Sequence, residues 1–179
     1  MAARMVSESE AGALSGLYGE IRTRLGLGEV PCVFRAMAAV SHDVLVQNWT
    51  AFRHTVLEGA LPKTVKQMVA LVVAREQGCG YGINLFSQVL SQHGVDSPVV
   101  ASLAEHGDCP DFPHGLRRLL AFARAYSLDP EGVDPEALEL EGFSEDDSAE
   151  VVDAVLITAG LVRFATECGL PADGDPFVK

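Results

Sequence analysis

Residues 59–82 read GALPKTVKQMVALVVAREQGCGYG, and this stretch decides the fold class. Pro62 stands where a proline opens a helix, in the first turn. Apolar residues then recur at helical spacing, at Val65, Met68, Val69 and Val72. Gly78 breaks the pattern, and the spacing predicts a second helix over residues 79–93, before Gly94. The stretch therefore predicts two consecutive helices.

Helical periodicity continues through most of the chain, and no segment alternates as a strand would. Ser7 with Glu10 forms a capping box, and Ser144 caps the last long helix. The sequence predicts an all-α protein of about eight helices in a single domain over residues 1–179. We expect its core over residues 30–172 and a loose tail over residues 173–179.

Composition narrows the class of protein and of partner. Lys and Arg number 13 against 25 Asp and Glu, which gives a net charge of −12 and argues against a nucleic-acid or anionic-membrane partner. Apolar residues make up 48% of the chain and aromatic residues 7%, a balance that suits packed helices. The first ten residues hold no apolar export segment, and the uncharged stretch 77–95 is too polar to cross a membrane. With four scattered cysteines, the sequence predicts a cytoplasmic protein with reduced thiols.

The order of these pieces resembles the alkylhydroperoxidase D-like (AhpD-like) and carboxymuconolactone decarboxylase superfamily. The resemblance covers about four fifths of the chain. It is carried by the segments VPCVFRAMA at 30–38, GALP at 59–62, VKQMVAL at 65–71, VAREQGCGYG at 73–82, GFS at 142–144 and RFATECGL at 163–170. It implies an AhpD-like helical bundle that forms a homo-oligomer, as dimers, trimers or hexamers.

In members of that superfamily with an intact site, the centre is a Cys-x-x-Cys pair at the start of a helix. A His follows four residues after the second Cys, and a Glu lies twelve residues before the first. The helix N-terminus stabilises the attacking thiolate, and the second thiol resolves its sulfenic acid as a disulfide. The Glu and His relay the proton.

This sequence keeps one of those four groups. Cys79 stands at the position of the first Cys, but Gly82 replaces the second, Phe86 replaces the His and Gln67 replaces the Glu. Gly82 supplies no resolving sulfur, and neither Phe86 nor Gln67 can carry a proton. Dithiol peroxidase activity is therefore not expected, and Gly82→Cys alone should restore a disulfide with little turnover.

Two further positions bear on the site that the resemblance implies. Tyr81 occupies a position where the superfamily often has Tyr or His, so it is a candidate polar group. Val162 stands where such sequences often place Asn, which removes another polar group. The candidate site residues are therefore Cys79, Tyr81 and Gln67, with Gly82 and Phe86 marking lost catalytic positions.

Cys79 has two interpretations. It begins an apolar helical stripe that continues at Ile83, Phe86 and Leu90, so it can be a small buried core residue. Its place at a helix start equally fits a reactive lone thiol. The other cysteines, Cys32, Cys109 and Cys168, are expected to be structural.

The remaining polar candidates are weaker. Arg75, at the end of the helix before Cys79, either stabilises that helix end or binds a thiolate or an anionic substrate. His54 is the histidine most able to reach an interior cavity, although surface duty suits it as well. The five histidines show no metal-binding spacing, and no nucleotide or phosphate motif is present, so we expect neither a metal nor a cofactor.

Three functions fit the sequence. The first is an enzyme that acts on a small organic molecule in the inherited cavity without dithiol chemistry, for example by decarboxylation or isomerisation. The second is a one-cysteine peroxidase or antioxidant oxidoreductase that uses Cys79 and an external reductant. The third is a non-catalytic oligomeric binding or structural module. The fold by itself does not choose between them.

Overall fold

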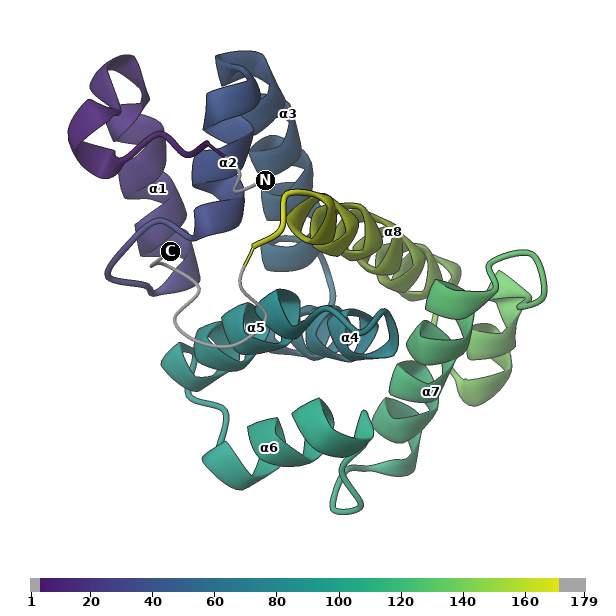
Figure 1. Ribbon diagram of the computed structural model, residues 1–179. Helices are drawn as coiled ribbons and strands as arrows, with labels where there is room; N and C mark the ends of the chain where they lie inside the picture. The colour runs from purple at the N-terminus through teal and green to yellow at the C-terminus, as the bar shows by residue number, and fades with distance from the viewer. Residues whose placement is uncertain (1–3, 171–179) are drawn as a thin grey trace.

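The computed structural model describes residues 4–170, and every regular element within them is helical, so the all-α prediction is confirmed (Figure 1). The predicted tail, residues 173–179, lies outside the described residues. Eight α-helices occupy Ser15–Leu25 (α1), Cys32–Val40 (α2), His42–Phe52 (α3), Lys63–Glu76 (α4), Gly80–Gln92 (α5), Ser97–His106 (α6), His114–Leu128 (α7) and Glu145–Glu167 (α8). Shorter helical turns lie at Glu8–Glu10 (η1), Gly12–Leu14 (η2), Arg53–Leu57 (η3, a π-helix) and Pro135–Glu141 (η4).

Helix α4 is the centre of this single domain. Every residue from 66 to 74 is buried, as expected of a helix that neighbours surround on all sides. It packs against α5, α6, α7 and α8, and Figure 1 shows α8 crossing over α4 and α5 while α6 and α7 flank them. The two helices predicted from residues 59–94 therefore form a hairpin whose first arm is the core of the molecule.

The N-terminal third adds an aromatic core. Phe34 of α2 meets the ring of Trp49 edge-on, with ring centroids 5.4 Å apart, and Phe52 stacks on Trp49 at 6.0 Å. Tyr18, Ile21 and Leu25 bury one face of α1 against the same core. Such aromatic pairs favour offset or edge-on geometry because of their ring quadrupoles.

Two predicted helix boundaries differ from the structure. The Ser7–Glu10 capping box forms, but it heads a 3₁₀ turn, and α1 begins only at Ser15 because Gly12 interrupts the helix with φ +48°. Apolar residues at Leu45, Trp49, Phe52 and Val56 predict one helix up to Gly59, but after Phe52 the structure continues as the π-helix η3. None of the helices within residues 4–170 combines the length and the hydropathy that a bilayer crossing needs.

Candidate functional site

Cys79 is the last residue of the turn between α4 and α5. It is the N-cap of α5, and the N–H of Gly82 donates to its Sγ over 3.4 Å. The thiol donates in turn to the carbonyl of Val162 on α8, 3.6 Å away. Only 5% of Cys79 is exposed, so its sulfur is enclosed between the first turn of α5 and the middle of α8.

Gly82 leaves no room for a second thiol. A Cβ at this position would lie 2.8 Å from Cγ1 of Val162 and 2.9 Å from Cβ of Ala74, distances that real Cβ atoms do not show. The missing side chain is thus what lets α5 pack against both α4 and α8. The expectation that Gly82→Cys restores a disulfide needs correction, because Val162 or Ala74 has to move first.

Phe86 is a core residue at the position where the superfamily resemblance implies a histidine. Its side chain is buried, and its ring stacks on Phe52 with centroids 6.2 Å apart. Through Phe52 it joins the cluster of Trp49 and Phe34. An aromatic wall therefore runs from the stripe of Cys79 on α5 to α2 and α3.

Tyr81, two residues after Cys79, lies in the first turn of α5. Its hydroxyl oxygen accepts the N–H of Val33, 3.0 Å away, at the start of α2. Burial, with a further contribution from the nearby Cys32 and Cys79 thiols, raises the pKa of Tyr81 far above its ordinary value. The phenol therefore stays protonated at neutral pH.

Gln67 is buried but does not join Cys79. Nδ1 of His93 lies 2.9 Å from Oε1 of Gln67, and since an amide oxygen only accepts, the ring nitrogen donates. The other amide atom, Nε2, is buried without a hydrogen-bond partner in the described structure. His93 follows α5 and Cys79 precedes it, so the two groups lie at opposite ends of that helix.

The sequence analysis missed His93 as a partner of Gln67. The signal was its place directly after α5, seven residues after Phe86 and three after Leu90, in line with the stripe that begins at Cys79. Burial, followed by the charge of Lys63, lowers the pKa of His93 below its ordinary value. A neutral imidazole at neutral pH follows from that shift.

Arg75 makes its contacts at the C-terminal end of α4. Its Nε donates to the carbonyl of Glu105, 3.1 Å away, and its Nη1 pairs with Glu76. Arg124 of α7 reaches the same Glu76 carboxylate at 2.9 Å. The guanidinium of Arg75 therefore binds α6 and the end of α4, which supports the structural interpretation of this residue.

One protein-family model and several solved structures are similar to this chain. Residues 44–125 match the Carboxymuconolactone decarboxylase family. This match spans a little under half of the chain and supports the resemblance to the AhpD-like and carboxymuconolactone decarboxylase superfamily. No protein of curated function matches the sequence at a significant level.

Solved structures of similar fold cover nearly the whole chain. A Cys-to-Ala variant of the debrominase Bmp8, in complex with 2,3,4-tribromopyrrole, is 21% identical with a TM-score of 0.83, over 98% of this chain and 94% of that one. An alkylhydroperoxidase AhpD core protein from Ralstonia eutropha is 20% identical with a TM-score of 0.82, over 98% and 94%. A peroxidase-related protein from Silicibacter sp. is 20% identical with a TM-score of 0.78, over 88% and 83%. At these identities the likeness establishes the fold.

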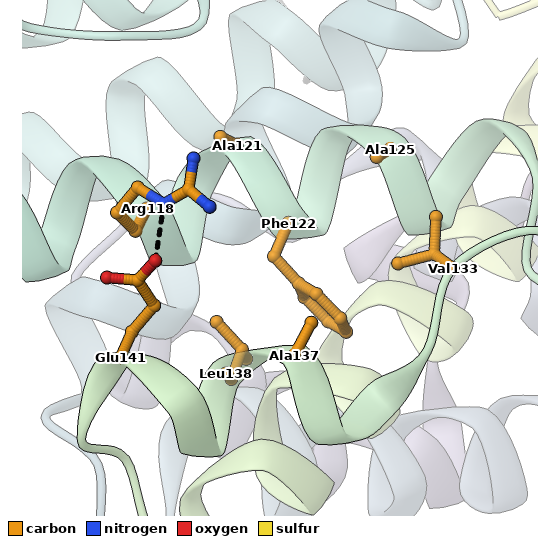
Figure 2. A pocket seen from close by; sticks show the side chains of 8 residues that line it. All are labelled: Arg118, Ala121, Phe122, Ala125, Val133, Ala137, Leu138 and Glu141. Carbon is orange, nitrogen blue, oxygen red and sulfur yellow. Dashed lines mark hydrogen bonds and ion pairs between the residues drawn. The ribbon is translucent and has the colours of Figure 1, made fainter.

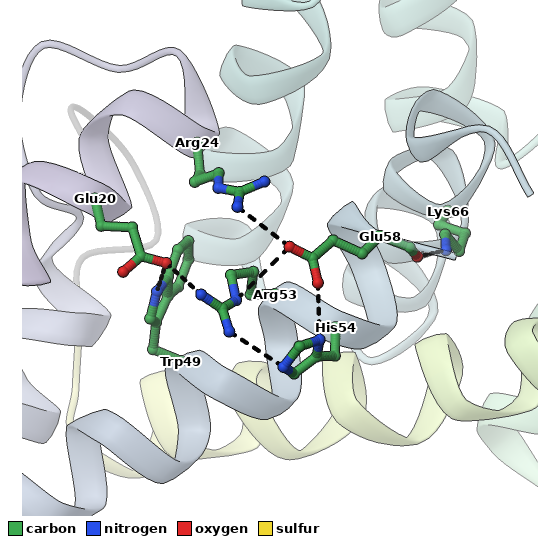
Figure 3. Close-up of polar contacts among 7 residues, drawn as sticks. All are labelled: Glu20, Arg24, Trp49, Arg53, His54, Glu58 and Lys66. Atoms are coloured by element: carbon green, nitrogen blue, oxygen red, sulfur yellow. Dashed lines mark hydrogen bonds and ion pairs between the residues drawn. The ribbon is translucent and has the colours of Figure 1, made fainter. Parts of the chain in front are cut away.

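A buried ion pair between Lys66 and Glu150, which we call the charged lock, was not predicted from the sequence. Lys66 of α4 is 0% exposed, and its Nζ donates to Oε2 of Glu150 on α8 at 2.9 Å. It also donates to the carbonyl of Glu58 (Figure 3). The Glu150 carboxylate also accepts the N–H groups of Ala60, at 2.6 Å, and Leu61, at 3.1 Å. Burial would raise the pKa of Glu150, but the hydrogen bonds from Ala60, Lys66 and Leu61 outweigh it and hold that pKa below its ordinary value.

Gly59 makes this lock possible. Its φ of +114° lies in the region that side chains disfavour, and a Cβ there would lie 2.6 Å from Oε1 of Glu150 and 2.7 Å from Nζ of Lys66. The GALP segment thus wraps around the Lys66–Glu150 pair. The position of Lys66 inside the apolar run of α4 was the sequence feature that could have indicated this ion pair.

His54 belongs to a surface network around the π-helix η3, and the interpretation that it reaches an interior cavity is wrong. Its side chain is 59% exposed, and its Nδ1 lies 2.7 Å from Oε2 of Glu58. Arg53 donates from Nη2 to its Nε2 over 3.1 Å and from Nη1 to Glu20 over 2.8 Å (Figure 3). Arg24 completes the network by pairing with Glu58 at 3.3 Å.

Neither a described hollow nor a metal cluster marks the Cys79 region. The hollows that the structure describes lie on α7 and η4, at the start of α8 and beside η1, and their linings do not include Cys79, Tyr81 or Gln67. Within residues 4–170 no three His, Cys, Asp or Glu side chains gather as metal ligands would. The site consists of one enclosed thiol, one phenol and an aromatic wall.

Proposed function

We propose that this protein acts on a small organic molecule bound beside Cys79, by chemistry that needs no dithiol pair. The observation that carries the proposal is the first turn of α5. There the N–H of Gly82 is directed at Sγ of Cys79, while Val162 and Ala74 occupy the space of a second sulfur. One thiol is retained in a polar setting, and the resolving thiol is sterically excluded.

The surroundings of the thiol favour an apolar, flat molecule. Phe86 and Phe52 stack, and ligand sites of small molecules are commonly lined by such rings with a few polar groups. Tyr81 supplies a protonated phenol close to Cys79. The complex of the debrominase Bmp8 with 2,3,4-tribromopyrrole supports the same class of ligand, a small halogenated ring, on this fold.

The reaction classes that remain are those that leave sulfur unoxidised. Decarboxylation, isomerisation or another tailoring step of a small metabolite fits a site with one thiol and one phenol. The match to the Carboxymuconolactone decarboxylase family supports this choice. Gln67 and His93 lie at the far end of α5, so we assign them no part in a proton relay to Cys79.

Protection of the thiol from alkylation tests the proposal. Iodoacetamide labelling of Cys79 is measured by peptide mass spectrometry, with Cys109, which is equally buried, as the internal control. We expect 2,3,4-tribromopyrrole to slow the labelling of Cys79 saturably and to leave that of Cys109 unchanged. Equal effects on both cysteines, or none, would contradict the proposal and favour the non-catalytic module.

A one-cysteine peroxidase is the second candidate, and the Gly82 N–H bond to Sγ is the observation that favours it. That bond would stabilise a Cys79 thiolate, and two solved structures of this fold are of peroxidase-related proteins. Trapping of a Cys79 sulfenic acid with dimedone after peroxide treatment would support it. Turnover would then depend on an external reductant.

Three wider assignments complete the proposal. We place the domain core at residues 30–172. We also propose a homo-oligomer, because Leu156 on α8 is 49% exposed and Val40, the last residue of α2, is 62% exposed. We place the protein in the cytoplasm, since the four cysteines, all within residues 4–170, form no disulfide. Light scattering tests the homo-oligomer, and a mass near 19.0 kDa at all concentrations would contradict it.

A further inference from the structure

Three adjoining hollows line the outer face of α7, far along the chain from Cys79. Ala121 borders all three, because its small side chain leaves the helix surface low at that point. Arg118 borders the first and second, and Arg124 borders the second and third. The hollows therefore form one continuous depression rather than separate sites.

The first hollow is apolar and closed at one end by an ion pair. It lies between α7 and η4, with a volume of about 240 Å³, and Phe122, Leu138 and Val133 line it (Figure 2). At its end, Nε of Arg118 donates to Oε1 of Glu141 over 2.8 Å. Typical ligand pockets hold about 300–1,000 Å³, so an occupant of this hollow is small.

The second hollow is rich in arginine although the protein carries a net charge of −12. Its volume is about 260 Å³, and its charged lining is Arg117, Arg118 and Arg124 against Asp108, with His114 beside them. Asp108 binds Arg117 through both carboxylate oxygens, and Glu76 binds Nε of Arg124 at 2.9 Å. Each arginine is thus fixed in place by a carboxylate.

The terminal nitrogens of two of these arginines remain available. Arg118 and Arg124 are each held through Nε, and no acceptor among the described residues takes a hydrogen bond from their Nη atoms. Figure 2 shows both Nη atoms of Arg118 on the side away from Glu141. A guanidinium with a free edge is suited to a carboxylate, which it binds in a planar, charge-assisted contact.

We propose that this depression is a binding site for a small amphipathic monocarboxylate. The apolar body occupies the hollow lined by Phe122, Leu138 and Val133, and the carboxylate binds the Nη edge of Arg118. Arg124, whose Nη atoms have no acceptor among the described residues, lies on the far side of the second hollow. The linings share no residue with the Cys79 region, so this inference does not depend on the function proposed there.

Calorimetry with a matched pair of ligands tests the proposal on the whole chain. Octanoate and 1-octanol have the same apolar body and differ in charge. We expect saturable binding of octanoate that is at least about tenfold tighter than that of 1-octanol and weakens with added salt. Acetate, which has the charge without the body, should bind at least about tenfold more weakly than octanoate.

Two substitutions locate the site, each with a control on another helix. Arg118→Gln should weaken octanoate about tenfold and leave 1-octanol unchanged, whereas Arg163→Gln on the exposed side of α8 should change neither. Ala121→Trp should abolish binding of both ligands by filling the depression, and Ala101→Trp on α6 is its control. Circular dichroism confirms that each variant is folded.

Three outcomes would overturn the inference. Equal affinity for octanoate and 1-octanol would remove the role of the arginines. Equal affinity for acetate and octanoate would remove the apolar hollow. Full octanoate binding by folded Arg118→Gln or Ala121→Trp would place the ligand elsewhere.

Discussion

Two buried regions, one near each end of α4, are stabilised in different ways. Near its start, Lys66, Glu150 and the backbone around Gly59 form a charged lock in which the ammonium and the carboxylate are hydrogen-bonded. After its end, the Cys79 thiol accepts the N–H of Gly82 and donates to the carbonyl of Val162, while the side chains of Val162 and Ala74 pack closely beside Gly82. The first region holds three segments of the fold together, and the second is where the superfamily's dithiol chemistry would lie.

The two regions contribute differently to the fold and to the site. The lock joins the GALP segment, α4 and α8, so it is tied to the geometry of the whole bundle. Gly82, Phe86 and Gln67 stand where the superfamily resemblance implies a second thiol, a His and a Glu, and all three are buried in the bundle.

The largest expected effect comes from breaking the lock. Glu150→Ala should lower the free energy of unfolding by about 3 kcal/mol, because it leaves a buried ammonium and two backbone N–H groups without their acceptor. Glu150→Gln, which keeps one acceptor, should lose less. Urea unfolding measures both, and a loss for Glu150→Ala within about 0.5 kcal/mol would mean that the lock contributes little.

The next effect comes from adding volume at the other end of α4. Gly82→Cys should cost about 2 kcal/mol, since its Cβ would overlap Val162 and Ala74. Val162→Ala in the same chain should recover part of that loss, so the two substitutions should be non-additive. Additive costs in a double-mutant cycle would show that the two positions are not in contact.

A smaller effect is expected at Gln67. Its unpartnered Nε2 is costly to bury, whereas its bond to His93 is favourable, so Gln67→Met should change the unfolding free energy by no more than about 1 kcal/mol. Gln67→Glu should raise the pKa of His93 by placing a carboxylate beside it. NMR titration of the His93 ring reads this shift, and an unchanged pKa would mean that the pair does not form in solution.

The smallest effect is the acid dependence of the lock. Because the pKa of Glu150 is held below its ordinary value in the folded state, the stability it contributes is present above that ordinary value. It is lost as the pH falls through the lowered, folded-state pKa. The wild-type protein should therefore lose more stability than Glu150→Gln between neutral and strongly acidic pH, and parallel pH profiles of the two would contradict this assignment.

Local pattern was sufficient to predict most of the fold. The apolar spacing of residues 65–72, Pro62 before them and Gly78 after them specified α4 and its turn, and Ser144 specified the start of α8. The π-helix η3 and the glycine-interrupted start of α1 were missed, because both depend on the backbone conformation of a few residues. Helical periodicity in sequence does not encode such local departures.

The candidate site was predictable only in part. The superfamily resemblance indicated Cys79 and Tyr81 as candidate site residues, and in the structure both lie at the start of α5. It did not reveal that Val162 fills the space beside Gly82, or that Gln67 turns to His93, because both facts depend on how α4, α5 and α8 pack. The Lys66–Glu150 lock was missed for the same reason, since its partners are 84 residues apart.

The central claim is that one thiol remains where the superfamily uses two. The direct test is to treat the protein briefly with tert-butyl hydroperoxide, map its disulfides by mass spectrometry and measure turnover with dithiothreitol. We expect no disulfide that includes Cys79, and turnover equal to that of Cys79→Ser. A Cys79 bridge to another cysteine, together with turnover that Cys79→Ser abolishes, would contradict the account.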